Sequence, residues 1–203
     1  MIERENILKD SIYVVKNFPS RKEQSDFWYF ANESDYAYGA NNVNKKRMKV
    51  TDSHMGKRQG RFTHHFNPDE FVKTTFWHRV KKSVNYPIRL MQAYINYAES
   101  STLNFPHCDD KADCLSILVC LNQDWHRNWG GYTSFFKDIS SNDIIETVVP
   151  EPGKAIFFNG RLFHTATPPN ITSQVPRFML AIKIEWLETE WIENEIETKK
   201  EEI

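Results

Sequence analysis

The chain has 203 residues, with 26 Lys and Arg against 27 Asp and Glu and a formal net charge of −1. This length fits one medium domain with a single core, and the near-neutral charge excludes a general attraction to nucleic acid or an acidic membrane surface. The apolar share of 40% is typical of a globular protein. Three cysteines are too few for a disulfide scaffold and favour a reducing compartment. Neither a signal peptide nor a run of about 18 apolar residues is present, so we expect a soluble, cytoplasmic protein of open oligomeric state.

The N-terminal region, residues 1–87, predicts a strand followed by helices. Residues 11–18 are β-branched and aromatic, as expected of a short strand. Ser20 and Glu23 then have the spacing of a capping box, which predicts a helix that runs to about Ala31. Apolar residues recur at helical spacing between positions 69 and 84 and predict a second helix.

A polar, basic segment from about residue 32 to residue 60 separates these two helices. It is either a functional segment, namely a mobile flap or a patch that steers an anionic substrate, or an ordinary solvated loop. We expect the histidines in and near it to be structural or exposed, because adjacent residues on a strand point to opposite faces. The basic residues are Lys45, Lys46, Arg47, Lys49, Lys57, Arg58 and Arg61, and the histidines are His54, His64 and His65.

Residues 88–186 contain short runs of strand-like residues separated by turn residues. The run 114–121 is apolar or small on both of its faces, which indicates a central strand covered on both sides. Regularly spaced strands of this kind predict a mainly β fold, a jelly roll or cupin-like double-stranded β-helix, with the N-terminal helices packed on one sheet. Residues 187–203 are acidic and form a tail. We therefore expect one domain over residues 1–203, with a jelly-roll core at 88–186.

His107 and Asp109 form a His-x-Asp pair, and His164 follows on a later strand. On an extended strand, residues two apart point the same way, so the pair can reach one metal ion. Two histidines and one carboxylate form the facial triad that holds Fe(II) and leaves positions open for a co-substrate and oxygen. Arg177 opens the last strand, and its planar guanidinium suits the far carboxylate of a dicarboxylate co-substrate.

Several further segments make the chain resemble the Fe(II)/2-oxoglutarate-dependent oxygenase superfamily, and most of all its prolyl 4-hydroxylase branch. They occur in the family's order around the His-x-Asp pair, the distal histidine and the basic residue of the last strand. These segments are the strand at 12–18, Tyr97 before the His-x-Asp pair, Leu-Asn at 121–122, Gly-Gly-Tyr-Thr at 130–133 and the strand at 152–158.

The resemblance implies an Fe(II)- and 2-oxoglutarate-dependent dioxygenase. His107, Asp109 and His164 would ligate the iron, Arg177 would hold the distal carboxylate of 2-oxoglutarate, and Tyr97 would lie near the co-substrate or substrate. The implied reaction uses O2, decarboxylates 2-oxoglutarate to succinate and hydroxylates a C–H bond, with a peptidyl proline or similar residue as the expected substrate. Ascorbate is a possible additional cofactor in such a reaction.

Two positions depart from the pattern of the hypoxia-sensing prolyl hydroxylases. Cys120 stands where those enzymes have a tyrosine that helps to bind the co-substrate, and Lys183 stands where they have a tryptophan. Lys183 is either a substrate or anion contact in the mouth of the site or a lysine that extends outward at the end of its strand. Cys108 and Cys114 are interpreted as bystanders.

Two other functions remain open at this point. One is oxidation of a small molecule or a nucleobase, for which Trp125, Trp129 and the basic segment could supply stacking and phosphate contacts. The single arginine on the last strand argues against a nucleic-acid substrate, because the nucleic-acid demethylase branch of the superfamily carries a second arginine there. The second alternative is a non-catalytic, cupin-like binding domain. In either case, selectivity would lie in the loops 32–66 and 122–131.

Overall fold

The computed structural model describes residues 1–38, 62–102, 104–110 and 112–187. The basic cluster at 45–61, His54 and most of the acidic tail lie outside these described residues. The helices are α1 (Arg4–Leu8), α2 (Arg21–Glu33), α4 (Pro68–Phe71), α5 (Thr75–Ser83) and the 3-10 helix η2 (Arg127–Trp129). The strands are β1 (Tyr13–Lys16), β2 (Ala37–Tyr38), β3 (Phe62–His65), β4 (Ile88–Ala98), β5 (Leu115–Cys120), β6 (Thr133–Phe136), β7 (Ile144–Val148), β8 (Lys154–Asn159), β9 (Phe163–Ala166) and β10 (Arg177–Trp186).

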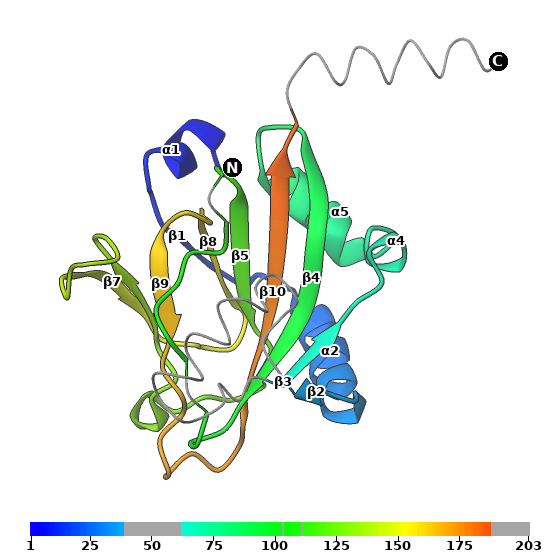
Figure 1. Cartoon of the computed structure of the whole chain (residues 1–203). Coiled ribbons are helices and arrows are strands. Elements are labelled where there is room, and N and C mark those ends of the chain that lie inside the picture. Colours follow the sequence, from blue (N-terminus) through cyan, green and yellow to red (C-terminus); the bar gives the residue numbers. More distant parts are fainter. Residues whose placement is uncertain (39–61, 103, 111, 188–203) are drawn as a thin grey trace.

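The strands form two antiparallel sheets. The larger has the order β1-β8-β5-β10-β4-β3-β2, and the smaller has the order β7-β6-β9. In Figure 1 the smaller sheet lies to the left of the long strands β4 and β10, and helices α2, α4 and α5 lie to their right. This mainly β arrangement with helices against one sheet is the predicted jelly roll.

The first long helix begins where the sequence predicts. The Ser20 hydroxyl accepts a hydrogen bond from the Glu23 N–H, and the Glu23 carboxylate accepts one from the Ser20 N–H, so the capping box is formed. The single helix predicted at 69–84 is instead two helices, α4 and α5. The Thr74 side chain accepts from the Trp77 N–H at 3.1 Å and caps the start of a new helix within the predicted one.

The side chains of β10 alternate between two faces, one packed against the helices and the other directed toward the smaller sheet. Phe178, Leu180 and Ile182 point toward the helices and belong to the main core cluster. Arg177, Met179, Ala181 and Lys183 occupy the opposite face, toward the smaller sheet. A second apolar cluster lies on that side and comprises Phe135, Val148, Ile156, Phe158 and Leu162.

The pairing of β10 with β4 contains one irregularity, located at Lys183. Lys183 is opposite Gln92 but Ile184 is opposite Leu90, so Met91 is an extra residue in β4. The Met91 side chain is exposed. The alternation of β10 therefore continues without a break from Arg177 to Lys183. Among the described residues, none of the helices has the length and apolar content that crossing a bilayer requires.

Candidate metal centre

The backbone brings His107 and His164 together. The N–H of each donates to the carbonyl oxygen of the other at 2.9 Å, which forms an isolated antiparallel bridge between a loop and β9. The centroids of the two imidazole rings are 4.6 Å apart. The Asp109 N–H donates to the Gly160 carbonyl oxygen at 2.7 Å, so the carboxylate residue is held by the turn that leads into β9.

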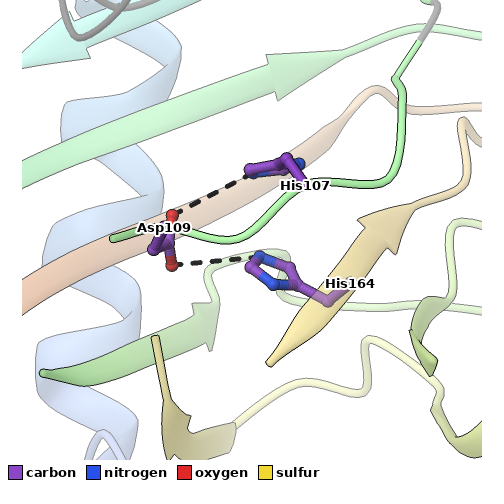
Figure 2. A group of neighbouring side chains, drawn as sticks. All are labelled: His107, Asp109 and His164. Carbon is purple, nitrogen blue, oxygen red and sulfur yellow. Dashed lines mark ion pairs between the residues drawn. The ribbon is translucent and has the colours of Figure 1, made fainter. Parts of the chain in front are cut away.

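The Asp109 carboxylate lies between the two imidazole rings, as Figure 2 shows. Its Oδ1 is 4.0 Å from His107 Nε2, and its Oδ2 is 3.8 Å from His164 Nε2. One ligand atom from each residue can be chosen such that all three lie within 4.8 Å of one another. The Asp109 and His164 side chains are 8% and 6% exposed, whereas His107 is 29% exposed, so access to the group is from the His107 side.

The hydrogen bonds of the two rings define which nitrogen atoms face the carboxylate. His107 Nδ1 is 2.9 Å from the Phe105 carbonyl oxygen, and His164 Nδ1 is 2.9 Å from the Leu162 carbonyl oxygen. A carbonyl oxygen only accepts, so each neutral ring carries its proton on Nδ1 and its lone pair on Nε2. Backbone carbonyls fix metal-binding imidazoles in this way.

Two side chains hold Asp109 ionised and oriented. The Ser116 hydroxyl donates to Oδ2 at 2.7 Å, and Lys183 Nζ lies 3.0 Å from Oδ1 and 3.1 Å from the Asp109 carbonyl oxygen. Burial alone would raise the pKa of this carboxyl group. His164, Lys183, His107 and the Ser116 hydrogen bond outweigh it and hold the pKa well below its usual range.

The donor set fits Fe(II). Two neutral imidazoles and one carboxylate on one side of an ion are the ligands of non-haem ferrous centres, with the remaining positions open. The Asp109 carboxyl group, whose pKa is held low, is in the ionised form that ligation requires. The residues that could hold the ion are therefore His107, Asp109 and His164.

Arg177 is buried on the same face of β10 as Lys183. It is 3% exposed, and its guanidinium donates to the Thr133 hydroxyl at 3.0 Å. Gly131 has a φ of +73°, and a Cβ there would lie 2.8 Å from the Trp125 ring and 3.1 Å from Arg177 Cδ. The glycine thus lets Trp125 and Arg177 approach closely, and a buried guanidinium in this position suits a carboxylate.

Cys120 lies in the wall beside Arg177. It is opposite Met179 on β10, and its thiol lies 3.1 Å from the Pro150 carbonyl oxygen. Burial raises the pKa of the Cys120 thiol to about 12, against the smaller opposing effect of Arg177. The residue that replaces the family's tyrosine is therefore a small, neutral thiol.

Tyr97 does not join the group. Its ring contacts Phe178 and Tyr36 edge-on or tilted on the helix-covered face, and its hydroxyl donates to Glu99. The tyrosine on the triad-facing side of β4 is Tyr94, which is opposite Ala181 and 4% exposed. Tyr94 was not singled out from the sequence. Once β4 is paired with β10, Tyr94 is opposite Ala181 and therefore shares the face of Arg177 and Lys183.

Lys183 takes neither of the two predicted roles, because it is paired with Asp109. Its side chain is only 11% exposed. Burial would lower the pKa of this lysine, but Tyr94 and Asp109 outweigh it and raise the pKa above its ordinary value. Sequence reasoning also missed Ser116 and Thr133, which contact the predicted site residues. Of the other histidines, His64 is packed against Phe30 and Phe66, and His78 is exposed on α5.

One family model and several solved structures resemble this chain. Residues 91–184 match the family model of the 2OG-Fe(II) oxygenase superfamily. A search of curated protein sequences finds no match. A prolyl hydroxylase from Trichoplax adhaerens, solved with a peptide fragment of the hypoxia inducible factor oxygen degradation domain, is similar with a TM-score of 0.62 and 16% identity over 89% of this chain and 86% of that chain.

Two further structures are similar at comparable levels. A prolyl-4-hydroxylase from Pseudomonas putida has a TM-score of 0.60 and 13% identity over 91% of this chain and 96% of that chain. HygX from Streptomyces hygroscopicus, with nickel, 2-oxoglutarate and hygromycin B bound, has a TM-score of 0.58 and 11% identity over 89% of this chain and 84% of that chain.

Residues 91–184 thus match the 2OG-Fe(II) oxygenase superfamily, and the predicted resemblance to this superfamily is confirmed. The fold of the chain is that of the prolyl hydroxylases and of related 2-oxoglutarate oxygenases. Fe(II) and 2-oxoglutarate are the cofactor and co-substrate of this family, as predicted.

Proposed function

We propose that this protein is an Fe(II)- and 2-oxoglutarate-dependent dioxygenase that hydroxylates a peptidyl proline or a similar residue. The observation that carries the proposal is the group formed by His107, Asp109 and His164, whose ligand atoms lie within 4.8 Å of one another. Arg177, buried on the same face of β10 as Lys183, supplies the cation that a dicarboxylate co-substrate needs. The prolyl hydroxylases among the similar folds support the choice of substrate class.

Each residue has a definite part in this reaction. His107, Asp109 and His164 would hold the iron, which together with 2-oxoglutarate would supply the activation of O2. Arg177 and Thr133 orient the distal carboxylate of 2-oxoglutarate through their existing hydrogen bond. Phe135 and Phe158 pack against the His164 ring, with centroids 5.8 and 4.9 Å away, and exclude water from that side.

The two oxygen atoms of O2 are divided between the substrate and 2-oxoglutarate. One oxygen atom of O2 enters the substrate C–H bond as a hydroxyl group. The other enters 2-oxoglutarate, which loses carbon dioxide and becomes succinate. Ascorbate is expected to sustain turnover by keeping the iron ferrous.

The test is succinate production by purified protein with Fe(II), 2-oxoglutarate and a proline-containing peptide library. Mass spectrometry should find a peptide heavier by one oxygen atom. His164→Ala should abolish both signals, while His78→Ala, which alters an exposed histidine on α5, should leave them unchanged. Undiminished turnover by His164→Ala would show that the ligands are wrong.

A small-molecule substrate is the second candidate, because the HygX fold is similar and that structure contains hygromycin B. Parallel incubations with the peptide library and with an extract of small metabolites separate the two. An oxidised metabolite without any oxidised peptide would replace the peptidyl assignment and retain the oxygenase.

We further propose one domain over residues 1–203 and a cytoplasmic location. β1 pairs with β8 and β3 pairs with β4, so the N-terminal region contributes to the same large sheet as the 88–186 core. All three cysteines are free thiols, in keeping with a reducing compartment. Fractionation of the native host, with succinate-forming activity in the cytosol, tests the location.

A further inference from the structure

Lys183 places a fixed positive charge against the proposed carboxylate ligand of the iron. Its Nζ is 3.0 Å from Asp109 Oδ1 and 3.1 Å from the Asp109 carbonyl oxygen. The two side chains are 11% and 8% exposed. Solvent screening is weak for such a buried pair, so this charge acts strongly on anything that binds the same carboxylate.

The lysine has little freedom to move away. It lies on β10, which is hydrogen-bonded to β5 on one side and β4 on the other, so its backbone is held from both sides. The irregularity in the pairing falls immediately after Lys183 and leaves the extra residue in β4. Withdrawing the ammonium group would also leave two buried acceptor oxygens of Asp109 without this donor, which is costly.

The net charge of the site differs between its metal-free and metal-bound states. Without metal, Asp109 and Lys183 sum to zero. With a divalent ion, two neutral imidazoles and one carboxylate give a centre of charge +1, and Lys183 raises the total to +2. The lysine therefore stabilises the metal-free site and opposes the incoming cation.

Resting on the function proposed above, we propose that Lys183 is a positioning residue that acts as the internal counter-ion of Asp109. It keeps the carboxylate aimed between the two imidazoles before metal arrives. It also weakens binding of a divalent cation by itself. A dianionic keto acid that binds beside the metal offsets the excess charge, so retention of the metal becomes coupled to the co-substrate.

The test is the affinity of the purified chain for Mn(II) at neutral pH, measured by the electron paramagnetic resonance signal of free Mn(II). The neutral variants Lys183→Met and Lys183→Gln should bind Mn(II) at least about tenfold more tightly than the wild type, because a buried unit charge near a divalent ion is worth more than one factor of ten. Lys183→Arg keeps the charge and should stay near the wild type. Lys183→Gln also keeps a hydrogen-bond donor for Asp109, which guards against misfolding of Lys183→Met.

A matched control is Lys154→Met. Lys154 is also 11% exposed and ion-paired, with Glu151 at 3.0 Å, but it lies on β8 in a different pair. Its loss should leave Mn(II) affinity unchanged. General damage to the fold weakens metal binding, so tighter binding is a result that a merely structural role of Lys183 would not give.

Addition of 2-oxoglutarate should reduce the difference in Mn(II) affinity between the wild type and Lys183→Gln, because the dianion offsets the excess positive charge of the wild-type site. Equal or weaker Mn(II) binding by both neutral variants would overturn the inference, and an unchanged difference would overturn the coupling. His164→Ala distinguishes failure of the proposed function from failure of the role of Lys183. If this variant binds Mn(II) as well as the wild type does, the proposed function itself fails. If His164→Ala loses Mn(II) and the neutral variants bind no better than wild type, only the role of Lys183 fails.

Discussion

His107 and His164 each donate their backbone N–H to the carbonyl oxygen of the other, at 2.9 Å in both directions. The relation does not involve the imidazoles, so the positions of both residues are set by the main chain. Removing one ring leaves this bridge in place. The site is therefore built before any ion binds, which is the preorganisation that a functional metal centre requires.

His107→Ala should abolish metal binding with little loss of stability. The His107 side chain is 29% exposed and its backbone bonds survive the change, so the free energy of unfolding should fall by less than about 1 kcal/mol. Mn(II) affinity should fall at least about 100-fold, more than loss of a supporting residue costs. Metal titration and urea unfolding of the metal-free protein measure the two effects. Unchanged Mn(II) affinity would remove His107 from the ligand set.

Ser116→Ala should weaken metal binding without abolishing it. The Ser116 hydroxyl donates to Asp109 Oδ2 at 2.7 Å, and loss of such a supporting bond typically costs about tenfold in metal affinity. The control is Ser134→Ala, a buried serine whose hydroxyl contacts Thr147 in the smaller sheet. Equal metal affinities for the two variants would mean that Ser116 does not orient the carboxylate.

Arg177→Met should raise the KM for 2-oxoglutarate at least about tenfold, because it would remove the guanidinium–carboxylate contact proposed for Arg177. Mn(II) affinity in the absence of 2-oxoglutarate should hardly change. Arg177→Lys should lie between the two, since it keeps the charge but not the planar fork. A KM unchanged in both variants would assign the co-substrate contact to another residue.

Gly160→Ala should destabilise the protein and disturb the metal centre together. A Cβ at Gly160 would lie 2.3 Å from Cys114 Sγ, 3.0 Å from Ser116 Oγ and 3.4 Å from Asp109 Cβ. Overpacking of this kind costs about 1–3 kcal/mol, measured by thermal unfolding. The double variant with Cys114→Ala removes the nearest atom and should recover part of the loss. Failure to recover any of it would place the strain elsewhere.

Glu23 should make a small, pH-dependent contribution to stability. Burial opposes ionisation of Glu23, but the hydrogen bonds from Ser20 and the contact with Arg79 outweigh it and lower its pKa. A lowered pKa in the folded state means that the contribution is present above the ordinary glutamate pKa of about 4.3 and is lost as pH falls through the folded value. Glu23→Gln should therefore cost at most about 1 kcal/mol at pH 7 and progressively less below about pH 4. A cost that stays constant across this range in urea unfolding would contradict the assignment.

Much of the fold follows from local rules. Alternation and turn residues located nearly every strand of the 88–186 core, and the Ser20–Glu23 spacing located the start of α2. The break between α4 and α5 was missed because the hydroxyl of Thr74 overrides the continuous apolar spacing on either side of it.

The grouping of His107, Asp109 and His164 was predictable because this set of residue types, in this order, matches the ligand pattern of a facial triad. Tyr97 was expected near the co-substrate from the resemblance alone, whereas the pairing of β10 with β4 sets it opposite Phe178 on the helix-covered face. The role of Lys183 depends on where a loop carries Asp109 relative to β10, which spacing along the chain does not define.

The two cations of the site lie on a single strand, an even number of positions apart. Any insertion or deletion of one residue between Arg177 and Lys183 would rotate one of them into the apolar core beneath α2 and α5 while the other stayed in place. The length of the strand between Arg177 and Lys183 is therefore constrained to remain the same.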